Sequence, residues 1–242
     1  MKGIILAGGM GTRLGILTKL TNKHLLPLFD RPLIYYPIQT LVNAGIKEIM
    51  IVTGGNSSGD FLRLLENGEE WNLKSLQYAY QRGSGGIADA LSLTKNFVGS
   101  DNMVVILGDN LFFDNIQLQV DKFSYVKYGS HIFLKQVLDP NRFGVVEFNE
   151  KYKIINIEEK PKEPKSNYAV VGLYMYTPHV FDVISTLKPS GRNELEITDV
   201  NNYYVKNNAI EYSMIQEEWI DCGTPSSLLK ASNLVASRRS NE

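Results

Sequence analysis

The chain has 242 residues, with 43% hydrophobic residues, 21% charged residues and a formal net charge of −1, which are ordinary values for a globular protein of one domain. Lysines and arginines are scattered and form no basic stripe, which argues against a nucleic acid polymer as the main partner. No apolar run reaches the ~20 residues of a membrane span, the first residues predict a strand instead of a signal peptide, and a single cysteine excludes an internal disulfide. We therefore expect a cytoplasmic protein with no membrane partner.

The start of the chain, Lys2–Ala7, predicts an apolar strand that runs into a glycine-rich loop, LAGGMGTRL. Glycine has no β-carbon and takes positive φ freely, so successive N–H groups of such a loop can point at one anion. An arginine adds a permanent charge with forked donors suited to phosphate oxygens. The loop predicts a phosphate cradle, formed by Leu6, Gly8, Gly9, Gly11, Thr12 and Arg13.

The loop differs from two better-known phosphate motifs. The Walker pattern GxxxxGKS/T is absent, and Leu14 stands where the dinucleotide pattern GxGxxG needs its third glycine. The second difference argues against a nicotinamide-dependent oxidoreductase. On the glycines alone, a tight turn with a surface arginine remains an alternative.

Helical and strand patterns alternate up to residue 127. Such alternation implies parallel strands joined by crossover helices, and hence a three-layer α/β sheet. Ligands of these sheets bind outside the carboxyl ends of the strands, where Gly8 and Asp109 would both emerge. Helices are predicted over residues 33–44, 60–65 and 87–97, and strands over residues 46–53, 76–80 and 103–107.

Two short segments follow predicted strands of this half. QRGSGG, residues 81–86, is a second glycine-rich turn, for which a flexible surface loop is the favoured interpretation on its own. LGDN, residues 107–110, places a lone carboxylate, Asp109, at a strand exit. Magnesium is commonly held by one or two carboxylates together with phosphate oxygens and water, so Asp109 is a candidate ligand. A carboxylate that caps the following turn is the alternative.

The pattern changes in the second half of the chain, where strands follow one another with little helix between them. This indicates an antiparallel addition that covers one end of the pocket. The strands are predicted over residues 131–136, 144–148, 153–157 and 169–176, and a final helix over residues 225–237 precedes a polar tail. Three histidines and the cysteine have no evident chemical partner and are expected to be structural: His24, His131, His179 and Cys222.

Motifs along nearly the whole chain, residues 2–236, resemble one family. In chain order they read LAGGMGTRL, NKHLLPL, RPLIYYP, RFGVV, EEKPKEPKS, NYAVVGLYMY and WIDCGT. Together they resemble the sugar-phosphate nucleotidyltransferases, and most closely the glucose-1-phosphate thymidylyltransferases of the short form. The resemblance implies a single domain over residues 1–242, with a Rossmann-like mixed sheet, helices on both faces and an antiparallel sugar-binding extension. Residues 1–127 would bind the nucleotide and residues 128–242 the sugar phosphate.

The resemblance implies a nucleotide site in the first half. The glycine-rich loop would wrap the triphosphate, and Arg13 and Lys23 would contact its phosphates. Gln81 would hydrogen-bond the base, against which Gly86 would lie. The loop departs from the family pattern at residues 15–17, where most members carry an aromatic residue and a proline.

The resemblance also implies a sugar-phosphate site. Glu159 would accept hydrogen bonds from two sugar hydroxyls, while Lys160 and Arg192 would neutralise the phosphate of the sugar. A solvated pair of Glu159 and Lys160, and a plain helix start after Arg192, are the alternatives. The residues implied are Leu107, Asn110, Phe143, Gly144, Glu159, Lys160, Val170 and Arg192.

The implied reaction transfers a nucleotidyl group from dTTP to glucose 1-phosphate and gives dTDP-glucose and pyrophosphate. The attacking phosphate oxygen is already anionic, so positioning and charge neutralisation would supply the catalysis without a general base. Asp109 and Asp221 would bind Mg²⁺ as the cofactor. The catalytic residues implied are Arg13, Lys23, Asp109, Lys160 and Asp221.

Alternatives to this reaction stay open. Asp89 stands where the longer members carry a glutamine, so UTP or CTP, or another hexose 1-phosphate, could replace the expected substrates. A non-catalytic sensor would be expected to have lost charged residues such as Arg13 or Asp109, which are present. By analogy with the family, we expect a homo-oligomer, a dimer or tetramer, that supplies a deoxysugar for polysaccharide synthesis.

Overall fold

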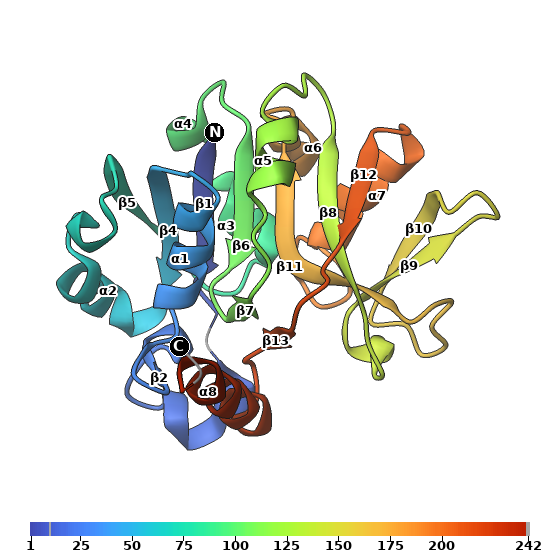
Figure 1. The fold of residues 1–242 in the computed structure, drawn as a ribbon. Coiled ribbons are helices and arrows are strands. Elements are labelled where there is room, and N and C mark those ends of the chain that lie inside the picture. The colour runs from blue at the N-terminus through green and yellow to red at the C-terminus, as the bar shows by residue number, and fades with distance from the viewer. Residues whose placement is uncertain (10, 241–242) are drawn as a thin grey trace.

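A nine-stranded sheet crosses the middle of the molecule (Figure 1). The computed structural model describes residues 1–9 and 11–240, so Met10 of the glycine-rich loop and the last two residues of the predicted polar tail lie outside it. The strands of the sheet are β1 (Lys2–Ala7), β4 (Glu48–Gly54), β5 (Ser75–Gln81), β6 (Met103–Leu107), β8 (Ser130–Gln136), β9 (Gly144–Phe148), β10 (Ile154–Glu159), β11 (Tyr168–Tyr176) and β12 (Ile210–Met214).

The first half of the chain forms the parallel part of the sheet, in the order β6-β1-β4-β5. The side chains of β1 alternate between the two faces, with Ile4 and Leu6 on one and Ile5 and Ala7 on the other, and all are buried. A parallel strand covered on both faces needs apolar residues at successive positions, which explains the continuous apolar runs of the sequence. The predicted strands and their parallel pairing are confirmed.

Helices cover both faces of the sheet, which confirms the predicted three layers (Figure 1). One face packs against α3 (Ile87–Ser92), α4 (Lys95–Val98), α6 (Val180–Thr186) and α7 (Ile197–Lys206). The other face packs against α1 (Tyr35–Asn43), α2 (Ser58–Leu65) and α5 (Gln117–Phe123). Short 3-10 helices occur at Thr12–Thr18, Lys23–Leu25, Gly55–Ser57, Glu69–Trp71 and Pro140–Arg142.

β11 joins the parallel part of the sheet to the second half of the chain. Its last residues pair antiparallel with β6, whereas Ala169 and Val170 near its start pair with β9. On its other side β11 pairs antiparallel with β8, and the register of that pairing shifts between Val170 and Tyr174. β9 and β10 form an antiparallel pair beyond it. The expected antiparallel extension is therefore present, with β12 as a parallel strand beside β8.

The helix predicted over residues 87–97 is wrong in one respect, since the structure divides it into α3 and α4. Near the break, the Ser92 hydroxyl donates to the Asp89 carbonyl at 2.7 Å and the buried Thr94 hydroxyl donates to the Leu91 carbonyl at 2.7 Å. Such side-chain bonds compete with the backbone bonds that would continue a helix.

The second half of the chain contains more helix than we expected, namely α6 and α7. The sequence of α7, ITDVNNYYVK, has few strong helix formers. Its buried residues nevertheless recur at helical spacing, with Ile197, Val200, Asn201 and Tyr204 facing the core. Packing of this face, and not intrinsic propensity, stabilises the helix.

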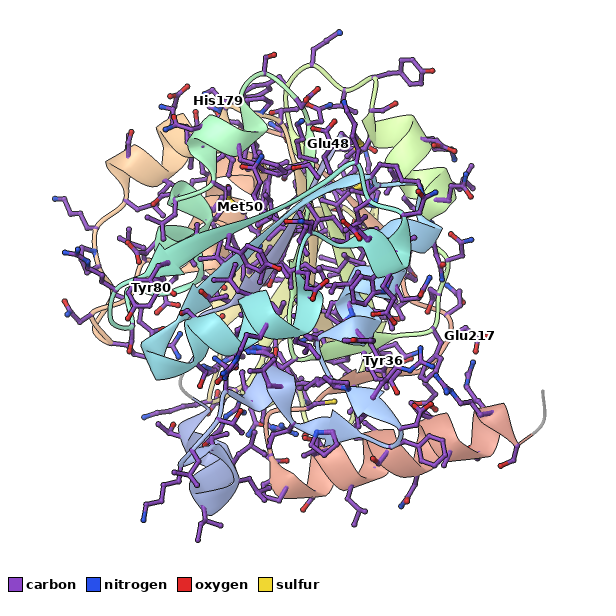
Figure 2. All side chains as sticks on the ribbon, turned by 90° about the vertical axis from the view of Figure 1, so that its left-hand side faces the viewer. Tyr36, Glu48, Met50, Tyr80, His179 and Glu217 are labelled. Carbon is purple, nitrogen blue, oxygen red and sulfur yellow. The ribbon has the colours of Figure 1, made fainter. Side chains whose placement is uncertain are left out.

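The last helix, α8 (Pro225–Arg239), packs on a small third core of its own. The core lies between α8 and a set of short strands, and a capping box of Thr224 and Ser227 starts the helix. Figure 2 shows α8 along the base of the molecule, with Tyr36 on the side that faces it. Cys222 is fully buried here and packs as expected. The short strands are β2 (Pro27–Leu28), which pairs with β3 (Arg31–Pro32), and β7 (Asn110–Phe112), which pairs with β13 (Trp219–Asp221).

Among the helices of the described residues, none has both the length and the apolar character that crossing a membrane requires.

Candidate active site

The carboxyl ends of β1, β5 and β6 open onto one cavity of about 480 Å³. Gly8 follows β1, Gln81 ends β5 and Asp109 follows β6, which is the edge where parallel α/β sheets bind ligands. All of the site residues expected from the sequence line this cavity: Leu6, Gly8, Gly9, Gly11, Thr12, Arg13, Lys23, Gln81, Gly86, Leu107, Asp109, Asn110, Phe143, Gly144, Glu159, Lys160, Val170, Arg192 and Asp221.

The glycine-rich loop folds closely over its neighbours. Gly11 takes a left-handed φ of 65°, and a β-carbon there would lie 3.1 Å from the β-carbon of Lys23. A β-carbon on Gly8 would lie 2.7 Å from the Oε1 of Gln81. Larger residues would push the loop off both side chains, so glycine is needed here for contact as well as for conformation.

Asn22 fixes the segment that carries Lys23 to the end of β1. Its Nδ2 donates to the Ala7 carbonyl at 3.2 Å, and its Oδ1 accepts from the backbone N–H of His24 at 3.0 Å. His24 is fully buried, and this burial lowers its pKa to about 3. The imidazole is therefore neutral at pH 7 and has a structural place, as the sequence led us to expect.

Lys23 forms an ion pair with Asp109 inside the cavity. Burial by itself would raise the pKa of Asp109, but the ammonium of Lys23 outweighs it and holds that pKa below its ordinary value. A hydrogen bond of 3.1 Å from the Nδ2 of Asn110 to the Oδ1 of Asp109 acts in the same direction. Asp109 is thus an oriented carboxylate that is ionised at neutral pH.

Asp221 reaches the same place from the far end of the chain. It lies opposite Asn110 in the pairing of β13 with β7, and the next residue, Cys222, donates its N–H to the Asp109 carbonyl at 2.8 Å. Burial and the charge of Asp109 raise the pKa of Asp221.

Two arginines flank Asp221, and each has its Nη2 3.8 Å from the Oδ2 of Asp221: Arg13 from the glycine-rich loop and Arg142. Arg142 belongs to the RFGVV motif, but we assigned no role to it from the sequence. Its place beside Asp221 depends on contacts between segments far apart in the chain.

The second half of the chain forms the other end of the cavity. Glu159 accepts a hydrogen bond of 2.7 Å from the Thr198 hydroxyl and lies 3.3 Å from the Nη2 of Arg192. Arg192 also makes two hydrogen bonds to Glu196, at 3.1 and 2.7 Å. Lys160 lies 3.5 Å from Glu159. We expected Arg192 and Lys160 to face a phosphate, and here both contact carboxylates.

Lys160 has an unusual backbone, with a left-handed φ of 48°. Its N–H donates to the carbonyl of Phe143 at 2.9 Å, which ties it to the RFGVV segment. Positive φ is uncommon for residues other than glycine and often accompanies functional positions. The adjacent Gly144 is in van der Waals reach of Glu159 and Thr198, so a side chain there would narrow this end.

The side chain of Asn110 makes three hydrogen bonds between the two ends of the cavity. Its Oδ1 accepts from the indole N–H of Trp219 at 2.7 Å and from the N–H of Gly172 at 3.2 Å. These donors turn its Nδ2 toward Asp109. A β-carbon on Gly172 would lie 2.7 Å from this Oδ1, so Gly172 leaves room for Asn110.

The cavity also has lining residues that we did not assign to the substrate site from the sequence: His24, Gly83, Ser84, Ile87, Ala90, Arg142, Tyr174, Glu194, Glu196, Ile197, Thr198, Asn201 and Trp219. Gly172, for which the resemblance implies room beside the sugar, lines it as well. Several of them, including Arg142 and Trp219, stand within the motifs that carried the resemblance. Motif membership was therefore the signal that could have identified them.

Carboxylate oxygens of Asp109 and Asp221 are hard ligands of the kind that Mg²⁺ prefers. Asp221 lies on β13, which pairs with β7 directly after Asp109. Burial, and after it the charge of Asp109, raises the pKa of Asp221, and a cation bound between the two carboxylates would offset both effects. Within residues 1–9 and 11–240, no cluster of three or more His, Cys, Asp or Glu side chains could hold a metal. The donor set fits an ion that takes two protein carboxylates and completes its shell with phosphate and water.

Comparison with known proteins gives a consistent family. A family model described as nucleotidyl transferase matches residues 2–238. The glucose-1-phosphate thymidylyltransferases of Neisseria meningitidis serogroup A and Mycolicibacterium smegmatis are each 42% identical over 238 residues, which is 97% of this chain and 82% of theirs.

Solved structures agree with this result. A candidate glucose-1-phosphate thymidylyltransferase from Bacillus anthracis, solved in complex with sucrose, is 51% identical, superposes with a TM-score of 0.92 and is matched over 97% of this chain and 94% of its own. A UDP-glucose pyrophosphorylase in complex with UDP-glucose is 27% identical, with a TM-score of 0.85 over 98% of both chains. On its sequence, its fold and its relatives, this chain belongs to the nucleotidyl transferase family.

Proposed function

We propose that this protein transfers the thymidylyl group of dTTP to glucose 1-phosphate and releases dTDP-glucose and pyrophosphate. The observation that carries the proposal is that one cavity gathers cations from both halves of the chain around two acidic side chains. Arg13 and Lys23 come from the first half and Lys160 and Arg192 from the second. The similarity to named glucose-1-phosphate thymidylyltransferases supports the choice of substrates.

The chemistry joins two anions. An oxygen of the sugar 1-phosphate attacks the α-phosphorus of the nucleotide; a new P–O bond forms, and the bond from the α-phosphorus to the bridging oxygen breaks. Pyrophosphate carries away the electron pair. Residues 128–242 hold the attacker through Lys160 and Arg192, and residues 1–127 hold the leaving pyrophosphate through Arg13 and Lys23. No proton needs to be removed, which suits a cavity in which His24 is neutral and fully buried.

Arg192 must exchange partners during this reaction. Its guanidinium contacts Glu196 and Glu159 here, and a sugar phosphate would compete with these carboxylates for the same donors. Glu159 would then be released to accept hydrogen bonds from sugar hydroxyls. The carboxylates therefore hold the arginine in place until the substrate arrives.

Asp109 and Asp221 are the residues that would hold Mg²⁺. When bound, the ion would neutralise charge on the phosphates of the incoming nucleotide and align them. Lys23 contacts Asp109 in this structure, so its ammonium is placed to neutralise Asp109 before the nucleotide binds and to contact phosphate oxygens afterwards.

A second candidate reaction uses UTP in place of dTTP. It is favoured by the likeness to the UDP-glucose pyrophosphorylase, which superposes over almost the whole chain. CTP and other hexose 1-phosphates are further variants of the same chemistry. A sensor without activity is less well supported, because Arg13, Asp109, Lys160 and Asp221 all line the cavity.

The test is pyrophosphate release by the purified protein with Mg²⁺, glucose 1-phosphate and each of dTTP, UTP, CTP, GTP and ATP. We expect the fastest release with dTTP and none when the metal is removed with EDTA. Faster release with UTP would move the protein to the second reaction. No release with any nucleotide would contradict the proposal.

We further propose that the protein works in the cytoplasm as a homo-oligomer, a dimer or tetramer. The support is analogy with the family. Size-exclusion chromatography with light scattering tests the assembly, and a monomer at micromolar concentration would contradict it.

A further inference from the structure

The amide of Gln81 is held in one orientation. Gln81 is 6% exposed and lies in the wall of the cavity. Its Nε2 donates to the carbonyl of Gly86 at 3.0 Å and to the Oδ2 of Asp89 at 2.7 Å. A carbonyl and an ionised carboxylate can only accept, so the reversed amide would place its oxygen against two oxygens.

The fixed NH₂ group determines what the amide presents to the cavity. Oε1 points to the opposite side, toward Gly8, where an added β-carbon would lie 2.7 Å from it. Within residues 1–9 and 11–240, no hydrogen bond to Oε1 occurs. Gly8 and Gln81 line the same cavity. The wall therefore offers a hydrogen-bond acceptor at this point.

Asp89 is itself held in place. A β-carbon on Gly85 would lie 2.4 Å from its Oδ2, so the carboxylate is packed against the backbone of the second glycine-rich turn. A hydrogen bond of 2.8 Å from the N–H of Leu195 to the carbonyl of Gly85 connects this glycine-rich turn to the second half of the chain. The carboxylate thus has little freedom to leave the amide of Gln81.

An acceptor at Oε1 distinguishes nucleobases by their ring nitrogen. Thymine and uracil carry an N–H at position 3 and can donate to Oε1. Cytosine carries a lone pair on N3, so two hydrogen-bond acceptors, N3 and Oε1, would face each other. The neighbouring walls from Leu6, Ile87 and Ala90 are apolar and suit a flat ring. This step rests on the proposed function, because it assumes that a nucleotide has its phosphates on the glycine-rich loop.

We infer that Asp89 is a positioning residue for nucleobase selection. By holding the Nε2 of Gln81, it turns Oε1 toward the N3–H of a 4-oxopyrimidine and disfavours cytosine. Asp89 acts through Gln81 and does not touch the nucleotide. Removing its carboxylate leaves only the Gly86 carbonyl to orient the amide, which can then reverse and accept cytosine.

A purely structural role for Asp89 gives a different expectation. Asp89 lies in the first turn of α3, where a negative charge stabilises the helix whatever ligand is bound. Loss of that charge would lower stability but leave base preference alone. Asp60 is a matched control, because it lies in the first turn of α2 and pairs with the exposed Arg63.

The experiment compares Asp89→Leu, Asp89→Asn and Asp60→Asn with the unmodified protein. The readouts are kcat/KM for dTTP and for dCTP with glucose 1-phosphate and Mg²⁺, and the Kd of each nucleotide by calorimetry without the sugar. We expect Asp89→Leu to lower the preference for dTTP over dCTP, measured as the ratio of their kcat/KM values and of their binding constants, roughly tenfold. This is the effect of about one hydrogen bond. Asp89→Asn keeps the shape but can face Gln81 with either atom, so a smaller fall is expected. Asp60→Asn should leave the ratio unchanged.

The two ideas fail separately. An unchanged ratio in Asp89→Asn, together with an unchanged ratio in any Asp89→Leu protein that folds, overturns the role of Asp89, even if dTTP is turned over normally. Absent turnover with a calorimetric ratio that falls as expected would overturn the proposed reaction and keep the role of Asp89. A protein that binds neither nucleotide would overturn both.

Discussion

The ammonium of Lys23 lies directly against the carboxylate of Asp109, and the two side chains are only 13% and 8% exposed. The residues are 86 positions apart in the chain, so the fold and not local sequence brings them together. Withdrawing two charges from water is costly, and their attraction offsets that cost only while both are present. The pair therefore links the stability of the protein to the arrangement of its site.

Lys23→Met should destabilise the protein more than Lys23→Met combined with Asp109→Asn. The single variant leaves a buried carboxylate without its cation, at a cost of about 3–5 kcal/mol, whereas the double variant leaves no buried charge at this pair. Urea unfolding at pH 7 measures both. Lys74→Met is the control, since Lys74 is 75% exposed in its pair with Glu48 and should change stability by less than ~1 kcal/mol. A double variant as unstable as the single one would contradict the argument.

Asp221→Asn should cut turnover by roughly a hundredfold or more, because the site loses charge that aligns the reacting phosphates. Its stability should not fall. The folded state raises the pKa of Asp221, so the ionised carboxylate is disfavoured by folding at neutral pH and its removal relieves that cost. Pyrophosphate release across a range of Mg²⁺ concentrations and a thermal melt are the measurements. Asp60→Asn provides the comparison, because Asp60 pairs with the exposed Arg63 on α2, neither residue lines the cavity, and turnover should stay unchanged.

Lys160→Ala should raise the KM for glucose 1-phosphate by roughly tenfold and leave the KM for dTTP nearly unchanged, since one charge-assisted contact to the sugar phosphate is lost. Steady-state kinetics with each substrate varied in turn checks this. Lys162→Ala removes an exposed lysine from the same segment and should have no effect. If the dTTP KM rose instead, Lys160 would belong to the nucleotide end.

The sequence predicted those parts of the site that depend on residues close together in the chain. The strand Lys2–Ala7 and its glycine-rich loop, and the apolar strand that delivers Asp109, follow from runs of neighbouring residues. Their carboxyl ends meet at one edge because parallel strands must align. The alternation of strands and helices alone therefore predicts that Gly8 and Asp109 lie at the same edge of the sheet.

What could not be predicted depends on contacts across the chain. No pattern in the sequence around Arg142 indicates that it lies 3.8 Å from Asp221. For Asp89 and Gln81, the only local sign of their hydrogen bond is that they stand eight residues apart on either side of a glycine-rich turn. α7 escaped detection because its Asn and Tyr residues favour helix weakly and its packing partners are remote. Long-range packing decides these features.

Acid should destabilise the protein below pH 6.5 through its buried histidines. Burial lowers the pKa of His24 to about 3 and that of His131 to about 4, whereas an unfolded histidine has a pKa near 6.5. Between these values the unfolded chain binds protons that the folded chain does not, so the free energy of unfolding falls as pH falls. From pH 6.5 to 5 each histidine contributes a loss of about 2 kcal/mol.

Urea unfolding at pH 7, 6 and 5 measures this slope. His24→Gln should flatten it by the share of one histidine, and His131→Asn by a similar share, while carboxylates contribute equally to all three proteins. A slope that is the same with and without His24 would mean that this histidine is not neutral in the folded state.

Lys135 should affect turnover although it does not line the cavity. Its Nζ donates to the carbonyls of Ile215, Gln216 and Glu217 at 3.3, 3.1 and 2.8 Å. From the other side, Asp114 accepts the N–H groups of Gln216 and Glu217 at 2.8 and 3.1 Å. This turn leads into β13.

The hydrogen bonds of Lys135 and Asp114 to residues 215–217 fix where β13 begins. β13 carries Asp221, which lines the cavity. Glu217, labelled in Figure 2, also pairs with Arg238 of α8 at 2.8 Å. Lys135→Met frees three carbonyls and lets the strand shift, and a shift of about 1 Å at a reacting group can cost up to a hundredfold in rate. We expect kcat to fall by roughly tenfold, with little change in the KM for dTTP, and more Mg²⁺ to be needed for half-maximal rate.

Lys122→Met, at an exposed position in the last turn of α5, is the control. A lowered melting temperature with unchanged kcat and unchanged Mg²⁺ dependence would show that Lys135 stabilises the turn without positioning Asp221.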